Sequence, residues 1–231
     1  MSGLRDFTLA RVGLRRAGNA LATGELLDFQ LAHALARDAV HASFDAAALL
    51  GEIRSRGWQG VVVASAVKDR AEYLKRPDLG RQLSDASRAE LDVAGKDTSV
   101  VVVIADGLSA LAVDRHALAL LDRMRLGADV PIVVAQQARV ALGDEIGERL
   151  RASLALMLIG ERPGLSSPDS LGAYLTWAPR VGRTDAERYC VSNIRAEGLS
   201  YDQAAARLLF LMQQANAANM TGTGLRAIKE R

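Results

Sequence analysis

The stretch SVVVVIADGLSALAVDRHALALL, residues 99–121, decides the fold. Its apolar run VVVVIA at 100–105 is rich in β-branched residues, which is typical of a strand buried on both faces. Asp106 and Gly107 then indicate a tight turn, and the apolar spacing after Ser109 predicts a helix to about Arg125. We therefore expect a strand, a turn and a helix of an α/β fold.

The same alternation continues along the chain. Two further apolar strands, DVPIVVAQ at 129–136 and SLALMLIG at 153–160, flank a helical segment, LGDEIGERLRA at 142–152. Strands that alternate with helices predict right-handed βαβ units and a parallel sheet flanked by helices, as in Rossmann-like and flavodoxin-like folds. The expected organisation is a mostly helical N-terminal part, residues 1–95, followed by an α/β domain, residues 96–231.

The N-terminal part is predicted to contain at least two helices. TGELLDFQLAHALARDAVHA at 23–42 places Leu27, Leu31 and Leu35 on one helical stripe. FDAAALLGEIRSRG at 44–57 starts with a candidate N-cap, Asp45, and ends at Gly57. WQGVVVASAV at 58–67 contains an apolar run of a length that suits a strand.

Composition argues against several functional classes. The net charge is +2 and basic residues are mixed with acidic ones, so the chain lacks the basic footprint of a nucleic-acid binder. A single cysteine, Cys190, indicates a reducing compartment, and no apolar run approaches the roughly 18 residues that span a bilayer. The Arg-rich N-terminal segment MSGLRDFTLARVGLRRAG, residues 1–18, lacks a signal-peptide core. Its loose amphipathic spacing suits an arm that packs on this protein or a partner, or a targeting or encapsulation peptide.

Three turns should meet at the carboxyl edge of the strands, where open α/β sheets bind ligands: ADGLSA (105–110), AQQARVALG (135–143) and GERPGLSS (160–167). Purely structural roles remain open, with Asp106 as a turn residue, Ser109 as a helix cap, and Glu161 and Arg162 as a solvated ion pair. The dense mixture of Gly, Pro, Ser and charged residues in GERPGLSSPDS, residues 160–170, favours a site.

Common cofactor and catalytic motifs do not fit. The chain has no P-loop, and TGTGL at 221–225 lacks the strand–helix context of a dinucleotide-binding glycine motif. Ser109 and His116 could be imagined in a hydrolase triad, but G-x-S-x-G is absent. Three histidines and one cysteine form no metal-ligand spacing. Asp114-Arg115-His116 begins like the cobalamin motif D-x-H-x-x-G, but Ala119 replaces the glycine, so we expect a helix-surface histidine.

Several segments together resemble the light chain of ethanolamine ammonia-lyase. They are RAGNALATGELLDFQLAHALARDAVH, RPDLGRQLSD, VVVIADGLSALAV, ARVALGDEIGE, GERPGLSSPDSLGAYLTW and CVSNIRAEGLS. The resemblance runs from about residue 10 to about residue 215, and GERPGLSSPDSL followed by SNIR is its most specific part. Arg15 and Arg16 depart from the Gly-Arg pair that is usual there, which bears on how the N-terminal arm docks.

The resemblance implies an adenosylcobalamin-dependent lyase of ethanolamine degradation, which converts ethanolamine to acetaldehyde and ammonia. The catalytic residues of this family lie on a heavy chain, a TIM barrel, so the light chain would be active only with that partner. The light chain closes over base-on cobalamin and supplies no cobalt ligand. It would work in the cytoplasm, free or inside a bacterial microcompartment, without nucleic-acid or membrane partners. Residues 1–95 would contact the partner, and residues 96–231 the cobalamin.

The matching motifs carry three cobalamin contacts to this chain: Val140, Glu161 and Cys190. Glu161 can accept hydrogen bonds from corrin amides, and Val140 can offer an apolar wall and backbone groups. Cys190 is small enough for the ring system to approach, or is simply a buried core cysteine. The turn after VVVVIA would belong to the rim of the crevice. No catalytic or metal-ligating residue is expected here. Two other functions remain open, a nucleotide-dependent oxidoreductase and a flavodoxin-like regulatory module.

Overall fold

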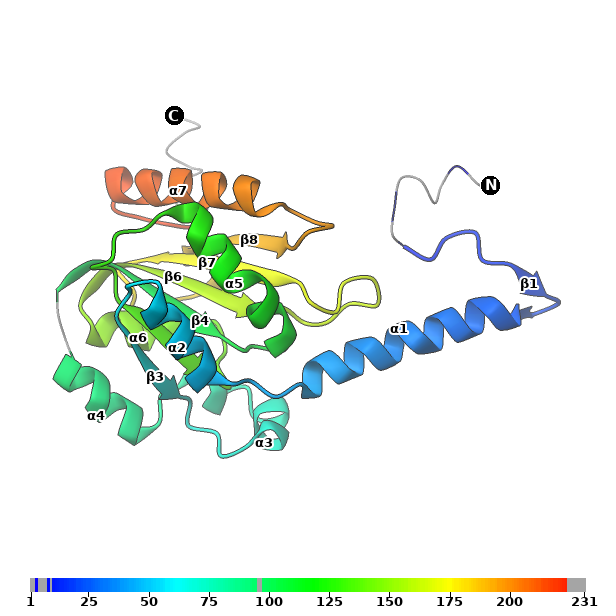
Figure 1. Cartoon of the computed structure of the whole chain (residues 1–231), viewed down its shortest axis with the longest axis horizontal. Coiled ribbons are helices and arrows are strands. Elements are labelled where there is room, and N and C mark those ends of the chain that lie inside the picture. Colours follow the sequence, from blue (N-terminus) through cyan, green and yellow to red (C-terminus); the bar gives the residue numbers. More distant parts are fainter. Residues whose placement is uncertain (1–2, 4–7, 9, 95–96, 224–231) are drawn as a thin grey trace.

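The computed structural model of the chain describes residues 3, 8, 10–94 and 97–223. The expected α/β class is confirmed, because a six-stranded sheet is flanked by helices (Figure 1). The sheet strands are β3 (Gly60–Ala64), β4 (Thr98–Ala105), β5 (Ile132–Gln136), β6 (Ala152–Gly160), β7 (Leu171–Trp177) and β8 (Arg188–Ile194). The helices are α1 (Thr23–His41), α2 (Ala46–Ser55), α3 (Arg70–Lys75), α4 (Asp85–Ala94), α5 (Ala110–Met124), α6 (Leu142–Arg149) and α7 (Tyr201–Ala218), with short 3-10 turns at Leu79–Arg81 and Asp185–Glu187.

The strand order is β3-β5-β4-β6-β7-β8. The three predicted strands lie together at its centre and are parallel, as expected. The strand expected within WQGVVVASAV is β3, which pairs in parallel with β5, so the sheet draws on residues from both parts of the chain. The sheet is not parallel throughout, because β7 and β8 are antiparallel additions to β6.

Local sequence explains where the central elements begin and end. The side chain of Ser109 accepts a hydrogen bond from the Ala112 amide and so caps α5, and the side chain of Asp45 caps α2 through the Ala48 amide. Arg125 ends α5 in a left-handed conformation. The predicted caps and the predicted end of α5 are therefore confirmed.

Two hydrophobic clusters pack on opposite faces of the sheet. The first lies beneath α2, α5 and α7 and includes buried residues of β7 and β8. The second lies beneath α4 and α6, and the strand residues buried in it come from β3, β4, β5 and β6. On this second face β7 contributes the half-buried Tyr174. On the same side Thr176 and Arg188 are buried, whereas Cys190 and Ser192 are exposed, so this chain covers the α6 side of β7 and β8 only in part.

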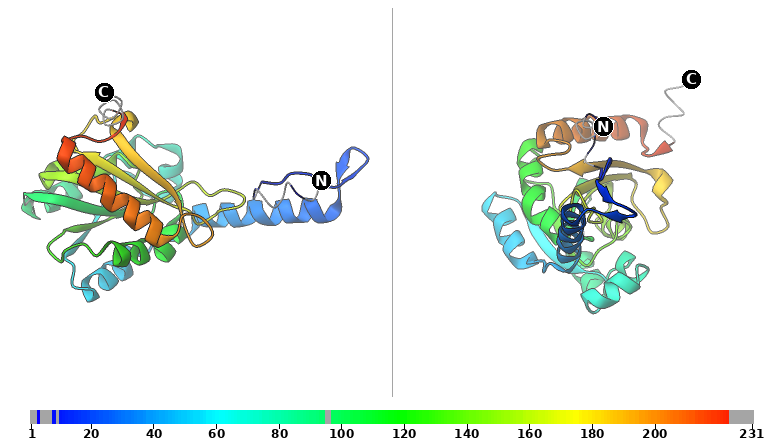
Figure 2. Two further views of the ribbon diagram at one scale, coloured as in Figure 1. Left: turned by 90° about the horizontal axis from the view of Figure 1, so that it is seen from above. Right: turned by 90° about the vertical axis from the view of Figure 1, so that its right-hand side faces the viewer.

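Helix α1 projects from the body of the molecule (Figures 1 and 2). Its predicted bounds are confirmed, but only Ala32 and Ala39 along it are buried. A small hairpin of β1 (Arg16–Ala17) and β2 (Ala20–Leu21) precedes it. The predicted N-terminal amphipathic segment, 1–18, includes residues 1–2, 4–7 and 9, which lie outside the described residues. In the part of the chain that the structure describes, no helix has both the length and the apolar character of a membrane span.

Candidate functional site

The three predicted turns do meet at the carboxyl edge of the parallel strands. The Leu108 amide donates to the Gly160 carbonyl over 3.0 Å, which joins the first turn to the third. The Ala138 amide donates to Asp106 Oδ1 over 3.2 Å, which joins the first turn to the second. Gly107 has a φ of 55°, and a Cβ there would lie 2.3 Å from the Gly160 carbonyl oxygen, so only glycine allows this approach.

The polar side chains of the first turn have the structural roles that the sequence left open for them. Asp106 and Ser109 are buried, and Arg70 Nη1 lies 3.1 Å from Asp106 Oδ2. Burial raises the pKa of Asp106 to about 6, while Arg70 opposes that shift. Ser109 caps α5 and also donates to the Pro168 carbonyl over 3.0 Å, so it anchors the third turn.

The second turn is fixed from below by a buried tyrosine. The Tyr73 hydroxyl donates to the Ala138 carbonyl over 2.8 Å, and the Arg139 guanidinium lies 4.3 Å from the centre of the Tyr73 ring. The Arg139 amide donates to the Gly80 carbonyl over 2.8 Å. These contacts hold the backbone directly before Val140, which is half-buried and lines a cavity of about 880 Å³.

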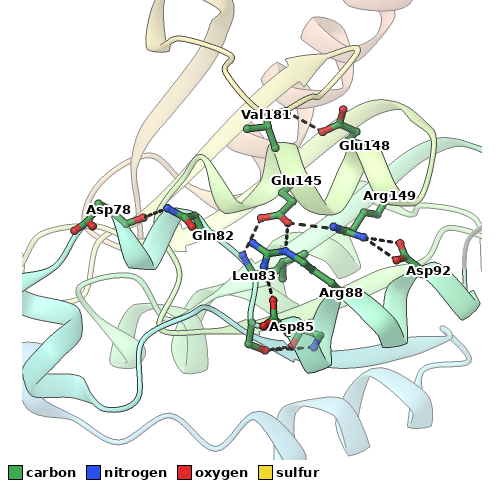
Figure 3. A network of polar contacts seen from close by, with 12 residues as sticks. Asp78, Gln82, Leu83, Asp85, Arg88, Asp92, Glu145, Glu148, Arg149 and Val181 are labelled. Carbon is green, nitrogen blue, oxygen red and sulfur yellow. Dashed lines mark hydrogen bonds and ion pairs between the residues drawn. The ribbon is translucent and has the colours of Figure 1, made fainter.

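The wall of this cavity beside α6 is a network of charges (Figure 3). Glu145 on α6 accepts from the Leu83 amide over 2.8 Å and from Arg88 Nε over 2.7 Å. Asp144 and Arg188 also line the cavity, and Arg188 Nη2 donates to Asp144 Oδ2. Both of these side chains are only 2% exposed. Burial raises the pKa of Asp144 to about 6, and Arg188 opposes that shift.

Glu161 lies at the start of the third turn, directly after β6. Its Oε2 accepts from the Ser170 hydroxyl and, over 3.2 Å, from the Asn193 amide. A Cβ on Gly172 would lie 3.0 Å from Glu161 Oε1 and 3.3 Å from Tyr174 Cε2. Glu161 and the Tyr174 ring therefore both pack over Gly172. These bonds tie the carboxylate to the residue before β7 and to β8, in place of the solvated pair with Arg162 that the sequence left open.

Cys190 on β8 is exposed, so the interpretation as a buried core cysteine is wrong. It lies opposite Tyr174 in the β7–β8 register, and its Sγ is 3.1 Å from Ser192 Oγ. Gly172, Tyr174, Cys190 and Ser192 thus share one side of this strand pair, which we call the open face. Burial raises the pKa of the Tyr174 hydroxyl, and Cys190 and Glu161 raise it further.

Tyr174 connects the three predicted contact residues. It shares the cavity lining with Val140, packs with Glu161 over Gly172, and faces Cys190 across the strands. Sequence reasoning missed it, although LGAYLTW places Leu, Ala, Leu and Trp at alternate positions, as a strand covered on one side should. The site therefore extends from the sheet edge onto the open face.

His116 is not the surface histidine that the sequence suggested. It is only 5% exposed, its Nδ1 lies 2.8 Å from the Tyr201 hydroxyl, and its Nε2 lies 3.6 Å from Asp169 Oδ2. Burial lowers the pKa of His116, whereas Asp169 opposes that shift. Its helix, α5, covers the face of the sheet opposite to the open face. Across the described ranges, no group of three or more His, Cys, Asp or Glu side chains is placed to hold a metal ion.

Known proteins match this chain over nearly its whole length. The family model for the ethanolamine ammonia-lyase light chain matches residues 1–226. The ethanolamine ammonia-lyase small subunit of Pseudomonas aeruginosa strain LESB58 is 54% identical, and the match covers 96% of this chain and 85% of the relative. The small subunit of Pseudomonas putida strain GB-1 is 54% identical, covering 96% and 86%. That of Pseudomonas fluorescens strain Pf0-1 is 52% identical, covering 96% and 85%. The chain belongs to the ethanolamine ammonia-lyase light chain family.

Proposed function

We propose that this chain is the light chain of an adenosylcobalamin-dependent ethanolamine ammonia-lyase and closes the cobalamin site against a catalytic heavy chain. The observation that carries the proposal is the grouping of Val140, Glu161 and Cys190 around Tyr174. The relatives are named small subunits, which supports a large-subunit partner. Under this proposal the heavy chain is a TIM barrel and the complex serves ethanolamine degradation.

The open face suits a large flat macrocycle with amide groups around its edge. Gly172, Cys190 and Ser192 are small, so a ring system can approach the strands closely. Glu161 can accept hydrogen bonds from amide N–H groups, and the Tyr174 hydroxyl can donate or accept one. When bound, adenosylcobalamin supplies the radical chemistry, and the protein supplies binding and orientation.

Each contact residue has a distinct task under this proposal. The Glu161 carboxylate is held in place by Ser170 and the Asn193 amide, so it meets the cofactor with little loss of side-chain freedom. Val140 offers an apolar wall on a backbone that Tyr73 fixes. His116 lies beneath the other face of the sheet, which supports base-on cobalamin without a protein ligand to cobalt.

The proposal also assigns a partner to each part of the chain and a location to the complex. Residues 1–95 contact the heavy chain, while residues 96–231 contact cobalamin. The complex works in the cytoplasm, free or packaged in a bacterial microcompartment. The missing glycine fingerprint argues against a nucleotide-dependent oxidoreductase. A regulatory module is the other alternative, and it predicts binding of a protein without cobalamin.

Reconstitution tests the proposal directly. Purified chain, ethanolamine ammonia-lyase heavy chain from the same organism and adenosylcobalamin should together convert ethanolamine to acetaldehyde, and each omission should abolish turnover. The visible spectrum should show cobalamin retained by the two-chain complex after gel filtration. Turnover by chain that is free of heavy chain would refute the assignment, as would a complex that retains no cobalamin.

A further inference from the structure

Helix α1 exposes more large apolar side chains than any other helix in the described part of the chain. Leu27, Leu31 and Leu35 are 58%, 60% and 50% exposed, and Leu26 and Phe29 are 42% and 40% exposed. Isolated apolar residues on a surface need no explanation, but five on one projecting helix do. Large apolar side chains on a helix normally face a protein core or a partner.

The apolar residues of α1 fall on two sides. Leu27, Leu31 and Leu35 recur every four residues and form one stripe, which we call the leucine stripe. At 100° per residue, Phe29 lies on the opposite side of the helix. Phe29 lines a hollow of about 470 Å³ together with Leu14 and Leu21 of the N-terminal arm and Leu165 of the third turn.

This hollow makes α1 continuous with the proposed cofactor site. Leu165 belongs to the turn that begins with Glu161, and it is itself 38% exposed. A protein that covers Glu161 and the open face therefore meets Leu165, and beyond it the apolar side of α1. The helix has 19 residues and is about 28 Å long, so it reaches well past the sheet edge along such a partner (Figure 2).

We propose that α1 is a docking helix that lies in an apolar groove of the heavy chain, with the leucine stripe as its anchor. This inference rests on the proposed function, because that function places the heavy chain against the turn of Glu161. A second copy of this chain is the rival occupant. A pair of α1 helices joined through the leucine stripe would leave the Phe29 side and Leu165 uncovered, so the heavy chain accounts for more of the exposed apolar surface.

The test replaces Leu31, the middle residue of the stripe, by charges of both signs. Leu31→Glu and Leu31→Lys keep good helix formers, so α1 should persist. Val93 is 91% exposed and belongs to α4, and Figure 1 shows α4 on the opposite side of the molecule from α1. Val93→Glu and Val93→Lys are therefore matched controls. We expect both Leu31 variants to weaken heavy-chain binding at least tenfold and both controls to change it less than twofold. Circular dichroism should show the same helix content and melting in all four.

These measurements distinguish failure of the docking helix from failure of the proposed function. If wild-type chain fails to bind heavy chain, the proposed function fails. If wild-type chain binds and supports turnover while the Leu31 variants bind equally well, only the docking helix is refuted. Sedimentation velocity of the chain alone tests the rival occupant, a second copy of this chain. A self-association that the Leu31 variants abolish, with heavy-chain binding unchanged, would assign the stripe to a second copy and overturn the proposal.

Discussion

The two sides of the β7–β8 pair differ although both are formed by alternate residues of the same two strands. On one side Leu175 and Val191 are fully buried in the cluster beneath α5 and α7. On the other side Tyr174 is half-buried and Cys190 is exposed. Alternation along a strand creates this contrast, and a helix completes one side only. The sealed side stabilises the fold, and the open face is where we propose that the ligand binds.

The carboxyl edge of the parallel strands, where ligands of α/β sheets usually bind, is largely filled in this chain. The three turns converge there, but Asp106, Ser109 and Tyr73 fill the space between them with buried hydrogen bonds. The groups that remain available lie farther along, where antiparallel strands extend the sheet beyond α6. Four substitutions test whether stability and ligand binding divide between the two sides in this way.

The largest effect is expected beside the open face, where β8 packs on α6 through the buried pair of Asp144 and Arg188. Arg188→Met removes the partner and leaves a carboxylate in a site where both side chains are 2% exposed. Loss of one member of a buried ion pair costs about 3–5 kcal/mol, so the free energy of unfolding should fall by that amount at pH 8.

This loss should depend on pH with a definite sign. Burial already raises the pKa of Asp144 to about 6, and removal of Arg188 removes the charge that opposes the shift. Because the pKa of Asp144 is raised in the folded state, ionisation of this group destabilises the fold as the pH rises above the ordinary pKa of an aspartate. Urea unfolding at pH 5 and pH 8 should therefore show a smaller deficit at pH 5. An equal deficit at both would place the cost elsewhere.

The sealed side is tested by Leu208→Ala on α7. Leu208 is fully buried against the strands, so its truncation should lower the free energy of unfolding by about 2–5 kcal/mol. Its side chain is separated from the open face by the sheet. The folded variant should therefore bind cobalamin in the two-chain complex like wild type. A tenfold weaker affinity would mean that the two sides are not independent.

Periodicity in the sequence predicted the centre of this fold well. The run VVVVIA, the cap at Ser109 and the helix after it depend on neighbouring residues, so local patterns were sufficient. The strands β7 and β8 were missed although they follow β6 directly along the chain. Their apolar residues only alternate with other residues, so they lack the continuous apolar run that identified the central strands. His116 was misplaced although Val113 and Ala117, its neighbours on the helix, are both buried.

The candidate site could not be predicted from patterns of neighbouring residues. Val140, Glu161 and Cys190 came from family resemblance, since fifty residues of chain separate the first from the last. Their spacing indicates no common site until β7 and β8 fold back beside β6. Asp106 looked like a ligand group because polar residues at strand ends often are. It is instead paired with Arg70, which lies 36 residues earlier and could not be assigned from sequence.

A large side chain on the open face should weaken cobalamin binding without destabilising the fold. Cys190→Phe places a ring where the proposed cofactor lies, so cobalamin affinity of the complex should fall more than tenfold. The side chain is exposed in the chain itself, and the free energy of unfolding should change by no more than about 0.5 kcal/mol. Cys190→Ala, which shrinks the side chain, should weaken binding less. Equal affinities for the two variants would argue that this face is not the contact surface.

The smallest expected effect is that of Glu161→Gln, which alters charge and keeps shape. Gln retains an acceptor for the Ser170 hydroxyl and the Asn193 amide, so the turn should stay in place. A hydrogen bond to a charged group contributes about 1.5–3 kcal/mol, and loss of about 1.4 kcal/mol corresponds to tenfold in affinity. Cobalamin titration of the two-chain complex, followed by turnover, should thus show about tenfold weaker binding. Arg162→Gln, one residue along and exposed, is the matched control and should stay within twofold of wild type. If Glu161→Gln also stays within twofold, the carboxylate serves only to join β7 and β8, and the open face binds its ligand without it.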